Sequence, residues 1–118
     1  MQSMFKENHS FQKRFEESKR IMDKYPGRIP IICERDPRSK DIPDIDRKKY
    51  LVPNDLSIAN FMYVIRKRLK LSPDKSIYLF INNFVMPATS QLLTTMYSEH
   101  CDNDGFLYVR YAGESTFG

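Results

Sequence analysis

The stretch of sequence that decides the fold runs from residue 28 to residue 35 and reads Arg28-Ile29-Pro30-Ile31-Ile32-Cys33-Glu34-Arg35. Its apolar residues recur with a period of two, which predicts a β-strand. One face of that strand would carry Ile29, Ile31 and Cys33, and the other would carry Pro30, Ile32 and Glu34. Because both faces are largely apolar, we expect a strand that is covered on both sides.

The residues before this strand show helical spacing instead. We predict a short helix near residues 3–8 and a stronger one over residues 10–24, in which Ser10 is the N-cap. Tyr25-Pro26-Gly27 then ends the helix. The periodic positions of the second helix are Phe11, Phe15, Ser18, Ile21 and Met22.

A second strand is predicted at residues 49–52, after a loop over residues 35–46. It begins with a lysine and is closed by Pro53, which is typical of an edge strand, because exposed charge and a missing N–H donor discourage uncontrolled pairing. The elements that follow are a helix capped by Asp55 or Ser57 and ending near Leu69, a strand at 77–81, a helix at 91–100 and a last strand at 106–111.

The order after residue 27 is therefore strand, strand, helix, strand, helix, strand. It predicts an α+β fold of the β-grasp type, a four-stranded mixed sheet around a central helix, although the order alone is compatible with other α+β folds. The 118 residues suffice for one domain. No apolar run approaches membrane-spanning length, and the two cysteines predict a soluble protein of a reducing compartment.

Catalytic and metal-binding patterns are weak. His100 and Cys101 are neighbours on a predicted helix end and point in different directions, and Cys33 alternates with core residues. The four glycines are too far apart to form a phosphate-binding loop. We therefore expect no enzyme. The net charge is +4, with 18 Lys and Arg against 11 Asp and Glu in residues 1–75, but the two signs alternate and no nucleic-acid-binding module is present, so we expect no nucleic-acid partner.

Several stretches resemble the autophagy ubiquitin-like modifiers, the family of the GABA-type-A-receptor-associated proteins and the microtubule-associated light chains. The similarity covers essentially the whole chain, departing mainly in the loops at 36–40 and 83–89. It is carried by residues 28–35, by DIPDIDRKKYLVP at 41–53, FMYVIRKRL at 61–69, IYLFIN at 77–82 and DGFLYVRYAGESTFG at 104–118.

The resemblance implies a ubiquitin-like domain over residues 27–118, with a flexible tail at 112–118 and a helical extension over residues 1–26 packed on the core. It implies conjugation of Gly118, the last residue of the sequence, to the amino group of phosphatidylethanolamine. The implied partners are an E1-like activating enzyme, an E2-like carrier enzyme and a processing or deconjugating cysteine protease. The chain itself would need no cofactor or metal, would be a monomer in its soluble form, and would move from the cytoplasm to autophagosomal and vesicle membranes.

The resemblance also implies that the edge strand at 49–51 binds cargo receptors and adaptors that carry short aromatic-x-x-aliphatic motifs. An aromatic pocket would be lined by Glu17, Ile21, Pro30, Ile32, Lys49, Leu51 and Phe106. An aliphatic pocket would be lined by Tyr50, Val52, Pro53, Leu56, Phe61 and Val64. The residues alone favour Pro30 and Ile32 as ordinary core beneath the N-terminal helix, and the two interpretations can hold together because helix and strand can form one pocket wall.

Four further cations, Arg28, Arg47, Lys48 and Arg68, would surround this groove and favour acidic residues beside the aromatic anchor. The resemblance also implies a possible secondary partner surface at Tyr78, Leu79 and Phe80, although a buried central strand explains these residues equally well. The alternative function is an unconjugated peptide-binding adaptor in vesicle trafficking or cytoskeletal linkage.

Overall fold

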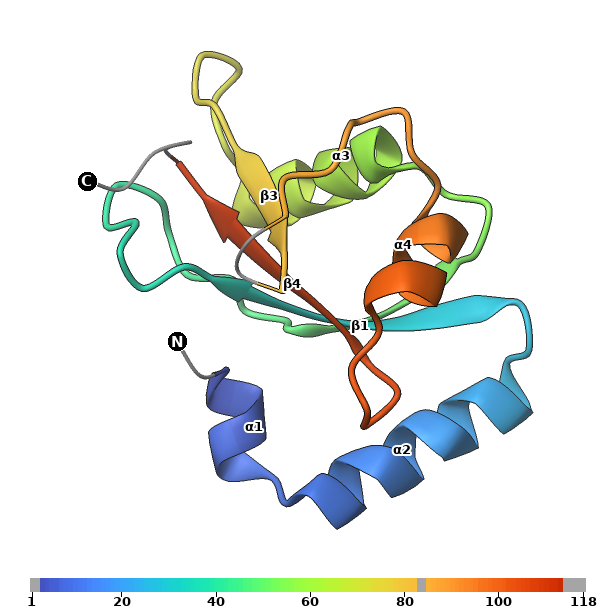
Figure 1. The fold of residues 1–118 in the computed structure, drawn as a ribbon. Helices are drawn as coiled ribbons and strands as arrows, with labels where there is room; N and C mark the ends of the chain where they lie inside the picture. The colour runs from blue at the N-terminus through green and yellow to red at the C-terminus, as the bar shows by residue number, and fades with distance from the viewer. Residues whose placement is uncertain (1–2, 83–84, 114–118) are drawn as a thin grey trace.

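A computed structural model describes residues 3–82 and 85–113 of the chain. Helices lie on both sides of one sheet (Figure 1). In chain order the elements are α1 (Met4–Asn8), α2 (Phe11–Lys24), β1 (Arg28–Arg35), β2 (Lys49–Pro53), α3 (Ile58–Leu69), β3 (Tyr78–Ile81), α4 (Leu93–His100) and β4 (Leu107–Ala112).

The four strands form one mixed sheet in the order β2-β1-β4-β3. β1 pairs parallel with β4, whereas β2 and β3 pair antiparallel with their neighbours. The first strand of the chain therefore lies in the middle of the sheet, and the residues of both its apolar faces are buried. β2 is an edge strand, which confirms the prediction made from its lysine and proline.

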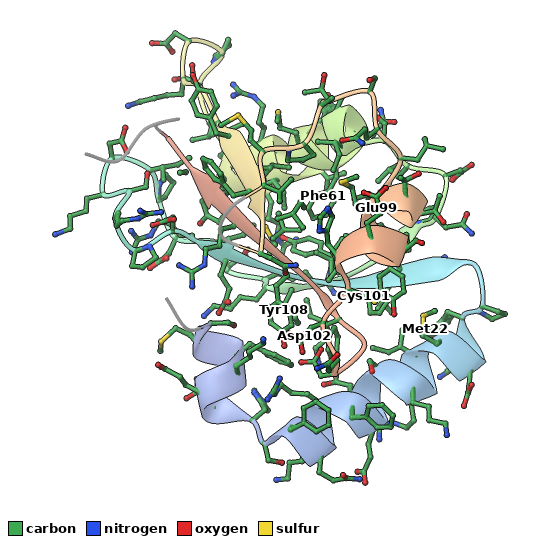
Figure 2. The ribbon with its side chains drawn as sticks, in the orientation of Figure 1. Met22, Phe61, Glu99, Cys101, Asp102 and Tyr108 are labelled. Atoms are coloured by element: carbon green, nitrogen blue, oxygen red, sulfur yellow. The ribbon has the colours of Figure 1, made fainter. Side chains whose placement is uncertain are left out.

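The main core lies between the sheet and the helices α3 and α4. From α3, Phe61 and Ile65 are fully buried, and Figure 2 shows Phe61 between the helix and the sheet. From α4, Leu93 and Met96 enter the same core. The strands contribute Ile29, Ile31, Cys33, Tyr50, Val52, Leu79, Ile81, Leu107, Val109 and Tyr111. Burial raises the pKa of the Cys33 thiol, which agrees with its interpretation as a core residue.

A second, smaller core lies on the opposite face of the sheet, beneath α1 and α2. It consists of Phe5, Ile32, Phe106 and Tyr108, with Ile21 packed against it. Figure 2 shows Tyr108 on this side of the sheet. Beside it, the buried carboxylate of Asp104 accepts hydrogen bonds from Arg14 Nη1 and from the Tyr108 hydroxyl, each at 2.6 Å. This network fixes α2 against the turn before β4.

The helix boundaries follow their caps. Ser10 accepts a hydrogen bond from the Lys13 N–H at 3.2 Å, as predicted for the start of α2. Of the two predicted caps for α3, Ser57 is the one used: its hydroxyl accepts from the Asn60 N–H at 3.1 Å, and Asn60 Oδ1 accepts from the Ser57 N–H at 3.4 Å. Lys70 ends α3 in the left-handed conformation, with φ 57°.

One strand departs from its predicted setting. A central position for residues 78–80 is wrong, because β3 is the second edge of the sheet. Its apolar run arises from two different environments: Leu79 is 2% exposed and faces the main core, while Tyr78 and Phe80 are half-buried on the other face. Within the described residues, no helix has both the length and the apolar character needed to cross a bilayer. The division of the chain at residue 26 stays a prediction.

Candidate functional site

The open edge of β2 is the most distinctive feature of the surface. Two hydrogen bonds fix the phase of the ladder with β1: Asn54 N–H donates to the Gly27 carbonyl at 3.0 Å, and Cys33 N–H donates to the Lys48 carbonyl at 2.7 Å. In this phase Tyr50 and Val52 direct their backbone polar groups at β1. Lys49 and Leu51 therefore direct theirs outward, toward an open edge.

The other edge of the sheet is partly closed. On β3, Ile81 donates its N–H to the Val85 carbonyl at 2.7 Å, and Val85 N–H donates back to the Ile81 carbonyl at 3.0 Å. This bridge occupies the outer backbone groups of Ile81, so that Leu79 is the only β3 residue with unbridged outer groups. Among the described strands, β2 is thus the better template for an added strand.

The predicted aromatic pocket comes together on the α1 and α2 side of the sheet. The strand register puts Pro30 opposite Leu51 and Ile32 opposite Lys49. Ile32 and Phe106 are fully buried and Pro30 is buried, while Leu51 and Ile21 are half-buried. Pro30 and Ile32 are therefore buried, as the core interpretation expects, and their part in a peptide pocket stays a prediction.

Lys49 and Glu17 form an ion pair across the mouth of this pocket. The Lys49 ammonium also lies 5.8 Å from the centroid of the Phe5 ring. Phe5 was not predicted as a pocket residue, although its ring packs edge-on against Phe106 with centroids 5.4 Å apart. The only feature of the sequence that indicates a buried Phe5 is Ser3, a possible helix cap two residues before this apolar side chain. Beside the pocket, α2 borders a hollow of about 530 Å³ lined by Glu17, Arg20, Ile21, Asp23, Lys24 and Tyr25.

The predicted aliphatic pocket lies on the opposite face, between β2 and α3. Tyr50, Val52 and Phe61 are buried, and the rings of Tyr50 and Phe61 pack edge-on with centroids 5.7 Å apart. These three belong to the main core, and their part in a pocket stays a prediction. The accessible residues are Leu56, which is half-buried, and Pro53 and Val64, which are exposed. The buried Tyr50 hydroxyl has no hydrogen-bond partner among the described residues, and burial raises its pKa to about 12.

Most of the predicted groove cations already have partners within the chain. Arg68 holds the Asp46 carboxylate with two hydrogen bonds, at 2.8 and 3.2 Å. Lys48 lies 3.7 Å from Glu34, and Arg28 makes a long contact of 3.5 Å with the Leu51 carbonyl. Arg47 is exposed. An acidic ligand would therefore compete with carboxylates of the protein itself.

The predicted surface at residues 78–80 is only partly accessible. Tyr78 and Phe80 share one face of β3 and are half-buried. Leu79 points into the main core, because the side chains of a strand alternate. Its assignment to a partner surface is wrong.

Gly118, the predicted conjugation site, lies outside the described residues. The described chain ends at Gly113, whose N–H donates to Ser39 Oγ at 2.9 Å. A Cβ at Gly113 would lie 2.9 Å from both carboxylate oxygens of Asp41, so this glycine allows a close approach of the backbone to the loop.

Comparison with known proteins identifies the family. Residues 13–118 match the family model described as autophagy protein Atg8, ubiquitin like. The chain is 58% identical to autophagy-related protein 8 of Mycosarcoma maydis, over 100% of this chain and 98% of that protein. It is 55% identical to autophagy-related protein 8d of Arabidopsis thaliana, over 98% and 95%. The crystal structure of Trypanosoma brucei ATG8 superposes with a TM-score of 0.92 at 38% identity, covering both chains completely. The chain therefore belongs to the Atg8 family of ubiquitin-like autophagy proteins.

Proposed function

We propose that this chain is an autophagy modifier that is conjugated through Gly118 to phosphatidylethanolamine and binds short acidic-flanked aromatic-x-x-aliphatic motifs of cargo receptors and adaptors. Membership of the Atg8 family supports the general role. The observation that carries the peptide-binding part is the open edge of β2, which has one predicted pocket on each face of the sheet.

The spacing of the motif follows from this geometry. In an extended peptide, residues i and i+3 point to opposite faces and lie about 10 Å apart. A peptide added to β2 would bond to the outward backbone groups of Lys49 and Leu51. Its aromatic residue would then enter the pocket on the α2 side, and the aliphatic residue three positions later would enter the pocket beside α3. Acidic residues next to the aromatic anchor would meet the groove cations.

The conjugation part rests on the family and on the chemistry of a terminal glycine. An activating enzyme would adenylate the Gly118 carboxylate with ATP and capture it as a thioester. A carrier enzyme would then bring the acyl group to the lipid amine, which forms an amide while the carrier's thiol leaves. A cysteine protease would process or release the modifier. The reactive cysteines belong to these partners, so the chain would act as a substrate of conjugation in the cytoplasm and as a receptor on autophagosomal membranes.

Calorimetry with an acidic aromatic-x-x-aliphatic peptide tests the groove. Leu51→Ala removes a half-buried wall residue, and it should weaken binding by roughly tenfold. Val85→Ala is the control, since Val85 is 37% exposed and pairs with Ile81 of β3, at the opposite edge of the sheet from β2. Unchanged affinity in folded Leu51→Ala protein would show that the peptide binds elsewhere.

Conjugation is tested separately, with family activating and carrier enzymes, ATP and phosphatidylethanolamine liposomes, followed by mass measurement. The unaltered chain should gain the mass of one lipid, and Gly118→Ala should sharply reduce that product. Full conjugation of the alanine variant would contradict attachment through Gly118. If the unaltered chain binds peptides but is never conjugated, the alternative holds: an unconjugated adaptor in vesicle trafficking or cytoskeletal linkage.

A further inference from the structure

A second hollow lies on the flank of α3 that faces away from the aliphatic pocket. Its volume is about 550 Å³, and it is lined by Tyr63, Arg66, Lys67, Lys70, Leu71 and Pro73. On a helix, residues three or four apart share a flank, so Tyr63, Arg66 and Lys67 lie together along one side. Phe61, Val64 and Arg68 recur with the same spacing on the other side. We call the new hollow the α3-end groove.

The wall of the α3-end groove is held in place by Arg66. Its guanidinium donates from Nη1 to the Lys75 carbonyl at 2.5 Å and from Nη2 to the Ser72 carbonyl at 3.0 Å. The Leu71 N–H donates to the Arg66 carbonyl at 3.2 Å, which closes the end of the helix. These bonds fix the segment at 71–75 against α3, so the groove is formed before any ligand arrives and binding would order little additional chain.

The charged residues that line this groove have one sign. All three charged lining residues are cationic, and within residues 3–82 and 85–113 neither Lys67 nor Lys70 forms an ion pair with a carboxylate. The acid of the adjoining segment, Asp74, accepts a hydrogen bond from Ser72 Oγ at 2.7 Å. The β2 groove differs, because Lys49, Lys48 and Arg68 already face Glu17, Glu34 and Asp46.

The apolar part of the groove is also accessible. The Tyr63 side chain is 57% exposed, and the Lys67 ammonium lies 5.3 Å from the centroid of its ring. Leu71 and Pro73 complete an apolar lining beneath the cations. Such a hollow accommodates one aliphatic or aromatic side chain, while the rim attracts carboxylates on either side of it.

We propose that the α3-end groove is a second peptide-binding site, for an acidic segment that carries a single apolar residue between carboxylates. A fixed hollow suits an inserted side chain, whereas a bilayer surface is met by apolar side chains that protrude from an amphipathic face. The site would let one molecule bind two segments of a partner, or two partners, because the two grooves lie on opposite flanks of α3. This inference does not depend on peptide binding at β2 or on conjugation.

The test is a titration of isotope-labelled protein, followed through its amide resonances, with a ten-residue peptide that has one leucine flanked by glutamates. This peptide lacks the aromatic-x-x-aliphatic spacing. Saturable shifts should centre on Tyr63, Lys67 and Leu71. Lys67→Glu with Lys70→Glu should weaken binding by at least about tenfold. The matched control is Lys13→Glu with Lys19→Glu, which makes the same change in net charge on exposed positions of α2 and should retain binding.

Two comparisons separate this site from the alternatives. Leu51→Ala alters the β2 groove and should leave this affinity unchanged; loss of binding in that variant would assign the peptide to β2. A peptide with glutamine in place of glutamate should not bind. The proposal is overturned if the glutamate peptide fails to shift these resonances, or if phosphatidylserine vesicles or a single-stranded oligonucleotide bind through Lys67 and Lys70 while the peptide does not.

Discussion

Arg68 at the end of α3 holds the carboxylate of Asp46 in a two-pronged contact, from Nε to Oδ1 at 2.8 Å and from Nη2 to Oδ2 at 3.2 Å. The pair lowers the pKa of Asp46, chiefly through the side-chain hydrogen bond, so Asp46 keeps its charge to a lower pH than an ordinary aspartate. Arg68 is a predicted contact for acidic residues of the peptide. The protein's own carboxylate therefore occupies the site at which a ligand carboxylate would bind.

Replacing Asp46 with asparagine should release Arg68 for the ligand. We expect peptides with acidic residues beside the aromatic anchor to bind about three- to tenfold more tightly, and peptides with neutral flanks to be unaffected. Calorimetry with both peptides measures the difference. Asp44→Asn is the control: it removes the same charge from the same loop, but its partner is Arg35, at 2.9 Å. Equal gains in the two variants would mean that net charge, and not Arg68, sets the affinity.

The buried hydroxyl groups of Tyr50 and Tyr108 differ in their hydrogen bonding. Tyr108 donates to Asp104 Oδ2 at 2.6 Å, whereas the Tyr50 hydroxyl has no partner among the described residues. Tyr108→Phe should therefore lower the free energy of unfolding by about 1–2 kcal/mol, because it leaves a buried carboxylate with one donor fewer. Tyr50→Phe should leave it unchanged or raise it by up to about 1 kcal/mol. Denaturant unfolding of both variants at neutral pH measures the contrast.

The buried hydroxyl of Tyr50 should also make the protein less stable at alkaline pH. Burial raises the pKa of Tyr50 from its ordinary value near 10 to about 12. Because the folded state favours the neutral phenol, its contribution is complete below pH about 10 and is lost as the pH rises toward 12. Between pH about 10 and 12, the free energy of unfolding should therefore fall less steeply with pH for Tyr50→Phe than for the unaltered chain. Identical pH profiles would show that other tyrosines account for the whole loss.

The elements of this fold could be predicted from local patterns, and the contacts between distant residues could not. The helix cap at Ser10 and the two apolar faces of β1 can each be recognised from a few neighbouring residues, because capping and alternation are local properties of the sequence. The ion pair of Arg14 with Asp104 joins residues 90 positions apart, and nothing in either neighbourhood of the sequence indicates it.

The candidate site divides in the same way. The edge position of β2 was predicted from Lys49 and Pro53, but family resemblance was needed to assign pocket residues on two faces of the sheet. Neither source revealed that Phe5 packs against Phe106, and the residues alone could not decide between a partner surface and a buried position for Leu79. Both features depend on how the elements pack. The sequence of a strand shows that a side chain is apolar, but not whether its face is covered by a helix of the same chain or by a partner protein.

Gly105 should tolerate no side chain, for two separable reasons. Its φ of +92° disfavours any L-residue, and an added Cβ would lie 2.3 Å from Ser18 Oγ. That hydroxyl cannot easily move, since it donates to the Asp104 carbonyl at 2.5 Å. We expect Gly105→Ala to cost about 2–4 kcal/mol of stability. In a Ser18→Ala background the steric part should shrink while the backbone strain remains. A double-mutant cycle by denaturant unfolding measures this coupling, and strict additivity of the two substitutions would exclude the clash.

The packing of α1 against the rest of the protein should depend on pH, because it involves the carboxylate of Asp102. Lys6 Nζ lies 2.6 Å from Asp102 Oδ1 and joins α1 to the turn before β4, where Figure 2 shows Asp102 beneath the sheet. Burial alone would raise the pKa of Asp102, but the hydrogen bonds from Lys6 and from the Asp104 N–H outweigh it and lower the pKa. A lowered pKa means that the pair stabilises the docked helix above pH about 4 and that this contribution is lost as the pH falls through the folded-state value.

The aromatic resonances of Phe5 report this release, because its ring packs 5.4 Å from that of Phe106. Acidification of the unaltered chain should move them toward the values of an exposed phenylalanine. Asp102→Asn should produce part of that movement already at neutral pH and should reduce the further change on acidification. Glu34 also contacts the start of α1, because its carboxylate accepts hydrogen bonds from Ser3 Oγ at 2.5 Å and from the Phe5 N–H at 3.1 Å. Resonances that follow the same pH course in both proteins would show that the Lys6 pair does not hold α1.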